Sequence, residues 1–95
     1  MVNEKKIVLL LDIAERALVV DMHEADRKAK YLSLVDAYKA WKAKRKIGRV
    51  ERNSPDWMRM QSDSEDEYLD FCVARDLEYN ARRRLSTAIR RYHAA

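Results

Sequence analysis

The chain has 95 residues, of which 47% are hydrophobic and 38% are charged, and its formal net charge is +4. This length allows one domain near the lower limit for a self-sufficient hydrophobic core, and the single Gly and single Pro favour long helices over sheets. The only cysteine, Cys72, excludes an intramolecular disulfide framework and indicates a reducing compartment.

The first predicted helix begins after Asn3, a good N-cap residue, and extends over about residues 4–47. Gly48 stands where a C-terminal cap glycine belongs, after a run of basic residues. The pattern leaves open whether this helix is continuous or kinked between Val19 and Met22. Apolar residues spaced by three and four positions predict a coiled-coil seam along it. These residues are Leu11, Leu18, Met22, Ala25, Ala29 and Leu32.

A connector is predicted over about residues 49–61. Within it, Ser54 suits a helix N-cap, Pro55 the first helical position and Asp56 the positive end of a helix dipole. The connector is therefore expected to contain a short helical turn through Trp57 and its neighbours.

The second long helix is predicted over about residues 63–93. Its start is open by two residues, because Ser62 with Glu65 and Ser64 with Glu67 both form capping boxes. Its seam again shows spacings of three and four. The seam residues are Phe71, Ala74, Leu77 or Glu78, Ala81, Leu85, Ala88 and Tyr92.

Two long helices joined by about 14 residues are expected to fold back antiparallel. Residues 39–52 carry a net charge of +6 and residues 63–70 a net charge of −5, and a hairpin places these segments side by side. We therefore predict an all-α fold for the single domain 1–95, a long antiparallel helical hairpin with a short helical turn between its two long helices.

The two long helices are expected to be unequal. With the turn near residue 55, the second helix ends level with about residue 15, so Met1–Ala14 project. Residues 7–13 are apolar on nearly every face, and a surface of that kind is normally buried. We predict self-association of two hairpins into a four-helix bundle, with a foreign protein covering the same surface as the alternative. The predicted self-association residues are Ile7, Leu10, Leu11 and Leu18.

The residues predict no catalytic site, no cofactor and no bound metal. His23 and His93 are far apart, and the chain has no HExxH motif, paired cysteines or glycine-rich phosphate loop. His23 shares a helix face with Asp26 or Arg27, but no second histidine or cysteine lies at ligand spacing. We expect a protein that is not an enzyme and has no small-molecule substrate.

The N-terminal apolar run, residues 7–11, is shorter than the roughly 7 to 15 residues of a signal peptide. Charged residues follow it closely, so the segment is not expected to span a bilayer. We therefore expect a cytoplasmic location and no membrane partner.

Five arginines near the C-terminus have two interpretations that stay open. Their spacing along a helix could contact the phosphates of a nucleic acid without reading its sequence, or they could complement the helix dipole and pair with Asp21, Glu24 and Asp26. Readout of bases is not expected, because the last helix opens with acids. The arginines are Arg82, Arg83, Arg84, Arg90 and Arg91.

Aromatic residues gather around the predicted turn, where we expect a satellite core. Tryptophan is also favoured at binding hot spots, so Trp41 and Trp57 are candidate contacts with a partner protein. The whole set is Tyr31, Tyr38, Trp41, Trp57, Tyr68 and Phe71.

Three parts of residues 55–92 carry a resemblance: Asp56-Trp57-Met58-Arg59, an acidic stretch ending in Glu67-Tyr68, and residues 78–92. This segment resembles small uncharacterised proteins encoded by double-stranded-DNA bacteriophages. The resemblance implies a protein made in the cytoplasm of a bacterial host that binds and redirects host proteins, and it implies no site residues.

We therefore predict a small helical interaction protein that self-associates and binds a protein partner. A sequence-independent nucleic-acid-binding protein and a structural or assembly subunit of a viral particle are the alternatives.

Overall fold

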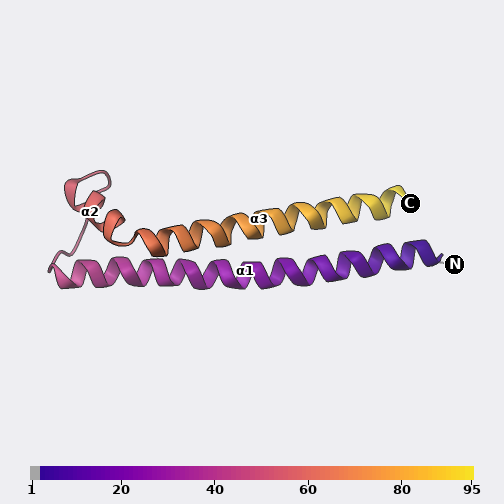
Figure 1. Ribbon diagram of the computed structural model, residues 1–95, viewed down its shortest axis with the longest axis horizontal. Helices are drawn as coiled ribbons and strands as arrows, with labels where there is room; N and C mark the ends of the chain where they lie inside the picture. Colours follow the sequence, from indigo (N-terminus) through magenta and orange to yellow (C-terminus); the bar gives the residue numbers. More distant parts are fainter. Residues whose placement is uncertain (1–2) are drawn as a thin grey trace.

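A computed structural model describes residues 3–95, and Met1 and Val2 lie outside the described part. Its helices are α1 (Glu4–Lys44), α2 (Pro55–Asp63) and α3 (Glu65–Ala94). Figure 1 shows α1 and α3 side by side and antiparallel, with both termini at one end and α2 at the other. The molecule measures 67 × 19 × 18 Å. The predicted all-helical hairpin with a short helix at its turn is thus confirmed.

Helix α1 begins as predicted and ends earlier than predicted. Asn3 Oδ1 accepts a hydrogen bond from the Lys6 backbone N–H at 2.8 Å, and the helix runs without a break through residues 19–22. Its end is made by Lys46 at φ 56°, after which the Ile47 N–H donates to the Lys42 carbonyl at 2.9 Å. This is the Schellman arrangement. The prediction that Gly48 caps the helix is wrong, because a lysine occupies the left-handed position two residues before it.

The short helix α2 is confirmed, whereas the capping boxes predicted for the next helix do not form. The Ser54 hydroxyl accepts from the Trp57 N–H at 3.1 Å, and Pro55 follows at the first helical position. Ser62 lies inside α2, and Ser64 stands before α3 without a side-chain capping bond. Because Ser64 is buried and its carbonyl accepts from the Tyr68 N–H, α2 leads almost directly into α3.

The face of α3 that packs on α1 is the predicted one. Ala74, Ala81 and Ala88 are 1–2% exposed, and one alanine in every seven residues lets the two helices approach closely. Of the two candidates for the third seam position, Glu78 faces α1 and is half-buried, whereas Leu77 is exposed.

The face of α1 that packs on α3 does not contain the predicted seam. All six residues of the predicted seam, among them Leu18 and Leu32, are exposed. The α3-facing residues are buried or half-buried and also repeat by three and four. Since Leu9 and Leu11 differ by two residues, or about 200° around a helix, the two rows lie on opposite sides of α1. The α3-facing row is Leu9, Ile13, Arg16, Val20, His23, Arg27, Lys30, Leu34, Ala37 and Trp41.

The predicted overhang of Met1–Ala14 is wrong for its described residues, 3–14. The Lys6 ammonium lies 5.3 Å from the centroid of the Tyr92 ring, and Leu9 and Ala94 line one hollow. Helix α3 therefore covers α1 almost to its N-terminus (Figure 1). The difference arises because the chain reverses near residue 52 rather than 55, as the Trp41–Asp63 and Arg27–Glu78 contacts show.

Candidate interaction surfaces

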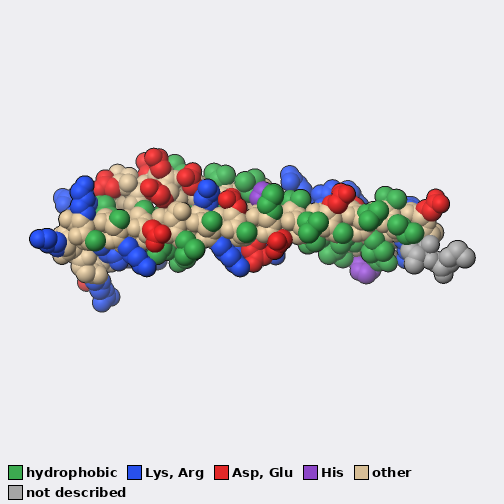
Figure 2. Space-filling model, turned by 90° about the horizontal axis from the view of Figure 1, so that it is seen from below, with side chains coloured by type: hydrophobic (Ala, Val, Ile, Leu, Met, Phe, Trp, Pro, Cys, Tyr) green, Lys and Arg blue, Asp and Glu red, His purple; other side chains and the backbone are tan. Residues whose placement is uncertain are grey.

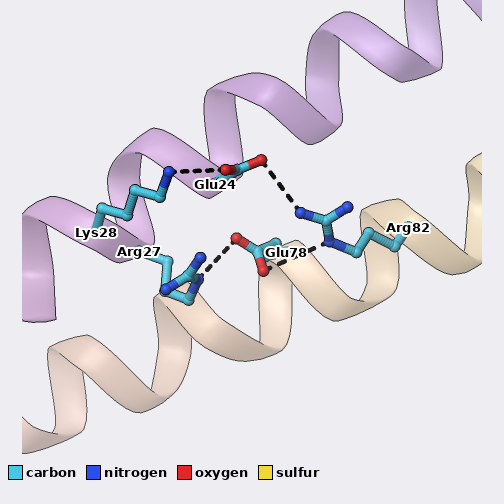
Figure 3. A network of polar contacts seen from close by, with 5 residues as sticks. All are labelled: Glu24, Arg27, Lys28, Glu78 and Arg82. Carbon is cyan, nitrogen blue, oxygen red and sulfur yellow. Dashed lines mark hydrogen bonds and ion pairs between the residues drawn. The ribbon is translucent and has the colours of Figure 1, made fainter.

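A network of five charged residues joins α1 to α3 near the middle of the hairpin (Figure 3). Arg27 Nε donates to Glu78 Oε2 at 2.8 Å, and Glu78 Oε1 also lies 3.5 Å from Arg82 Nε. Arg82 Nη2 reaches Glu24 Oε2 at 3.2 Å, and Glu24 pairs with Lys28 at 2.9 Å. The Glu78 side chain is only 12% exposed, so these cations compensate a carboxylate inside the helix interface. Arg27 lies seven residues after the buried Val20 and therefore on the same face of α1. This spacing is the feature of the sequence that indicates the network.

The network is expected to make the hairpin sensitive to acid. The hydrogen bond from Arg27 holds the pKa of Glu78 below its ordinary value of 4.5, and the hydrogen bond from Lys28 lowers the pKa of Glu24 in the same direction. A carboxyl with a depressed folded pKa stabilises the fold above its unfolded pKa, and that contribution disappears as the pH falls through the folded pKa. Urea unfolding from about pH 7 to about pH 3 should therefore show a loss of stability below pH 4.5 that is smaller in Glu78→Gln.

The exposed Glu51 of the connector, which forms no ion pair within residues 3–95, provides the control. Glu51→Gln should keep the acid sensitivity of the wild type, and an equal loss in Glu78→Gln and the wild type would contradict the assigned role of Glu78.

The side of α1 opposite α3 is an exposed apolar strip, called here the outer face. Figure 2 looks onto the α1 side of the hairpin and shows hydrophobic side chains gathered along the N-terminal half of the helix. Leu18 is 71% exposed, the largest value among the exposed large hydrophobic residues of the described chain. Glu15 is the one charged residue in this three-four row. The apolar members of the outer face are Val8, Leu11, Leu18, Met22, Ala25, Ala29 and Leu32.

The four residues predicted to mediate self-association are all exposed. Leu11 and Leu18 belong to the outer face, and Ile7 and Leu10 flank it near the N-terminus. Their surface therefore extends along the side of the hairpin rather than from its end.

The two tryptophans proposed as partner contacts have different environments. Trp41 is buried, and its Nε1 donates to Asp63 Oδ2 at 2.8 Å beneath the Arg45 guanidinium. Because of this packing, the Trp41 side chain exposes almost no surface that a partner protein could contact. Trp57 is half-buried beside a hollow that Tyr38 also lines.

The five C-terminal arginines separate into one that is paired and four that are not. Arg82 belongs to the central network, but no ion pair joins the other four to an acid within residues 3–95. The ion pairs predicted for Asp21 and Asp26 do not form in this part of the chain. Arg16 of α1 lies beside Arg84 and Arg91. The spacing of residues within the last helix does not reveal this neighbour, because Arg16 comes from the other long helix.

No group of three metal-ligating side chains is found in the described chain. His23 is half-buried in the row that faces α3. Across residues 3–95, none of the helices combines the length and apolar character needed to cross a lipid bilayer.

Comparison of the chain with known protein families, with curated protein sequences and with solved structures gives no match in any of the three.

Proposed function

We propose that this protein is a non-enzymatic helical interaction protein that pairs with a second copy of itself along the outer face of α1. Two hairpins would then form a four-helix bundle with the two α1 helices at its centre. The observation that carries this proposal is the presence of two rows on opposite sides of α1: α3 covers the mixed row and leaves the apolar row exposed. Exposed apolar strips of this length mark interaction sites on folded proteins.

The exposed surface area of the single hairpin is large enough to accommodate a protein partner on the outer face. A compact monomer of 11.3 kDa is expected to expose about 5,700 Å², whereas this chain exposes 7451 Å². The difference of about 1,700 Å² exceeds the roughly 800 Å² that each partner contributes to a standard interface. The radius of gyration, 20.1 Å, likewise exceeds the value of about 12 Å for a compact domain of this length.

The order of residues on the outer face favours a second copy in antiparallel orientation. If the twofold axis passes between Leu18 and Met22, each large side chain of the strip meets another large side chain or an alanine, and no two alanines face each other. The layers are then Val8 with the partner's Leu32, Leu11 with the partner's Ala29, Glu15 with the partner's Ala25, and Leu18 with the partner's Met22.

The position of Glu15 separates the two orientations. A parallel pairing places Glu15 against the partner's Glu15 inside the seam, where like charges repel. The antiparallel pairing places it against small Ala25, which leaves the carboxylate a route to water. The antiparallel arrangement also brings Asp21 near its own copy, but repulsion between exposed charges is weak, under about 1 kcal/mol.

As part of the same proposal, we infer from the resemblance to phage-encoded proteins that this pairing occurs in the cytoplasm of a bacterial host. A foreign helix with the same apolar spacing is the competing occupant of the outer face, and it would correspond to a host protein bound by the monomer. A subunit of a larger particle is the third possibility, in which association continues past the dimer.

Light scattering of the purified chain at low and high salt tests the proposal. We expect twice the chain mass of 11.3 kDa at both salt concentrations, because apolar contacts are not screened by ions. A monomer at both concentrations would overturn self-pairing and favour a foreign helix. Growth beyond the dimer with protein concentration would favour an assembly subunit instead.

A further inference from the structure

The C-terminal half of α3 forms one side of a shallow, strongly basic groove. A hollow of about 310 Å³ lies between this segment and α1. Four arginines and two neutral polar residues line it, and one of the arginines comes from α1. The lining residues are Arg16, Asn80, Arg83, Arg84, Thr87 and Arg91.

A second basic hollow of about 400 Å³ adjoins the first, because Arg83 and Thr87 line both. The Thr87 hydroxyl accepts a hydrogen bond from Arg90 Nη2 at 3.2 Å and donates to the Arg83 carbonyl at 3.1 Å, which orients the Arg90 guanidinium. The Arg83 guanidinium lies 5.8 Å from the ring centroid of Tyr79, which is 62% exposed. The two hollows are together called the arginine groove.

Structural roles do not account for the charges of the arginine groove. Arg16 is neutralised by Asp12 at 3.1 Å and Arg82 by the central network, but Arg83, Arg84, Arg90 and Arg91 pair with no acid in the described chain. The helix dipole acts only within the last turn of a helix. Of these four arginines, only Arg91 lies in the last turn of α3. Three cations therefore gather without a compensating partner or dipole.

The spacing of these cations suits a chain of phosphates. Arg83 with Arg90 and Arg84 with Arg91 form two rows whose members lie about 10 Å apart along the helix axis. This distance corresponds to about three phosphates of one strand in a duplex. The planar guanidinium binds phosphate through two parallel N–H donors, and an exposed tyrosine offers its face to an unpaired base.

From these observations, we propose that the arginine groove binds the sugar–phosphate backbone of a nucleic acid without reading its sequence. None of its residues belongs to the outer face of α1, so the inference is independent of self-association.

Fluorescence anisotropy with a labelled single-stranded oligonucleotide and its duplex tests the inference on the full chain. Four phosphate contacts predict a slope of about −2.8 for log K against log salt with the single strand. Replacing two of them in Arg84→Gln/Arg91→Gln should reduce that slope to about −1.4 and weaken binding at about 50 mM salt at least tenfold. Binding of either the single strand or the duplex with this pattern supports the inference.

The matched control removes the same charge at the other end of the hairpin. Lys39 and Arg49 are exposed and form no ion pair within residues 3–95, so Lys39→Gln/Arg49→Gln should keep the wild-type slope. Circular dichroism verifies that both variants remain helical. No binding by the wild type at low salt, or an equal loss in both variants, would overturn the inference.

Poly-L-glutamate of matching charge separates nucleic acid from acidic protein. The carboxylates of poly-L-glutamate lack the tetrahedral geometry of phosphate, and the polymer has no base that could stack on Tyr79. We therefore expect it to bind the arginine groove at least about tenfold more weakly than the oligonucleotide does. Equal affinity for poly-L-glutamate would assign the arginine groove to acidic proteins and reject a nucleic acid.

Discussion

Replacing Leu18 with Asp is expected to convert the proposed dimer into a monomer of 11.3 kDa. Leu18 lies at the centre of the outer face and is 71% exposed in the single hairpin. Burying a leucine side chain stabilises an interface by roughly 1.5–3 kcal/mol. Each substitution occurs twice in a twofold-symmetric dimer, so this contribution is lost twice. The dissociation constant should therefore rise by about a hundredfold or more, as measured by light scattering over a dilution series.

Val73→Asp is the matched control, because Val73 is an exposed apolar residue on the other long helix, at 59% exposure. It should leave the mass unchanged. Leu18→Lys, which keeps a good helix former, should behave like Leu18→Asp if loss of the apolar contact is the cause. Dissociation by Val73→Asp but not by the Leu18 variants would move the interface to α3 and contradict the proposal.

Replacing Ala81 with Leu is expected to destabilise the hairpin by about 1–3 kcal/mol, because extra methylenes in a packed interface force the surrounding side chains and backbone to shift. Ala81 is 2% exposed and is the middle one of three buried alanines on α3. Because Ala81 is buried against α1, a larger side chain at this position fits only if the two helices move apart. Urea unfolding followed by circular dichroism measures the change.

Ala43→Leu controls for the helical propensity of the two residues, since Ala43 is exposed on α1 and both residues are good helix formers. A change under about 0.5 kcal/mol is expected there. An unchanged stability in Ala81→Leu would mean that α3 does not press its alanines against α1.

The sequence predicted the local structure where a local interaction determines it. Asn3 and Ser54 accept the first backbone N–H groups of α1 and α2, and their neighbours in sequence are sufficient for that. Ala74, Ala81 and Ala88 were placed correctly because α3 has only one row of residues with small side chains and regular spacing. The end of α1 was misplaced because a left-handed lysine, Lys46, replaces the expected glycine, and no local rule favours a lysine there.

The assignment of the α1 rows failed for a different reason. Periodicity finds an apolar row but does not say which neighbour covers it. The outer face is almost purely apolar, so its spacing predicts a seam there, although α3 does not cover it. The true contact includes His23, Arg27 and Lys30, whose charges and polarity conceal it in a hydrophobic pattern.

The sequence by itself determined that the protein consists of long helices joined by a short capped helix, and that α1 carries an apolar row without a local partner. Only the tertiary structure decided which side of α1 meets α3 and how far α3 reaches. The physical reason lies in Glu78, which α3 places inside its own contact face. A carboxylate there requires a cation at the same level. Arg27 provides that cation, at 2.8 Å, on the mixed side of α1, and the outer face has none.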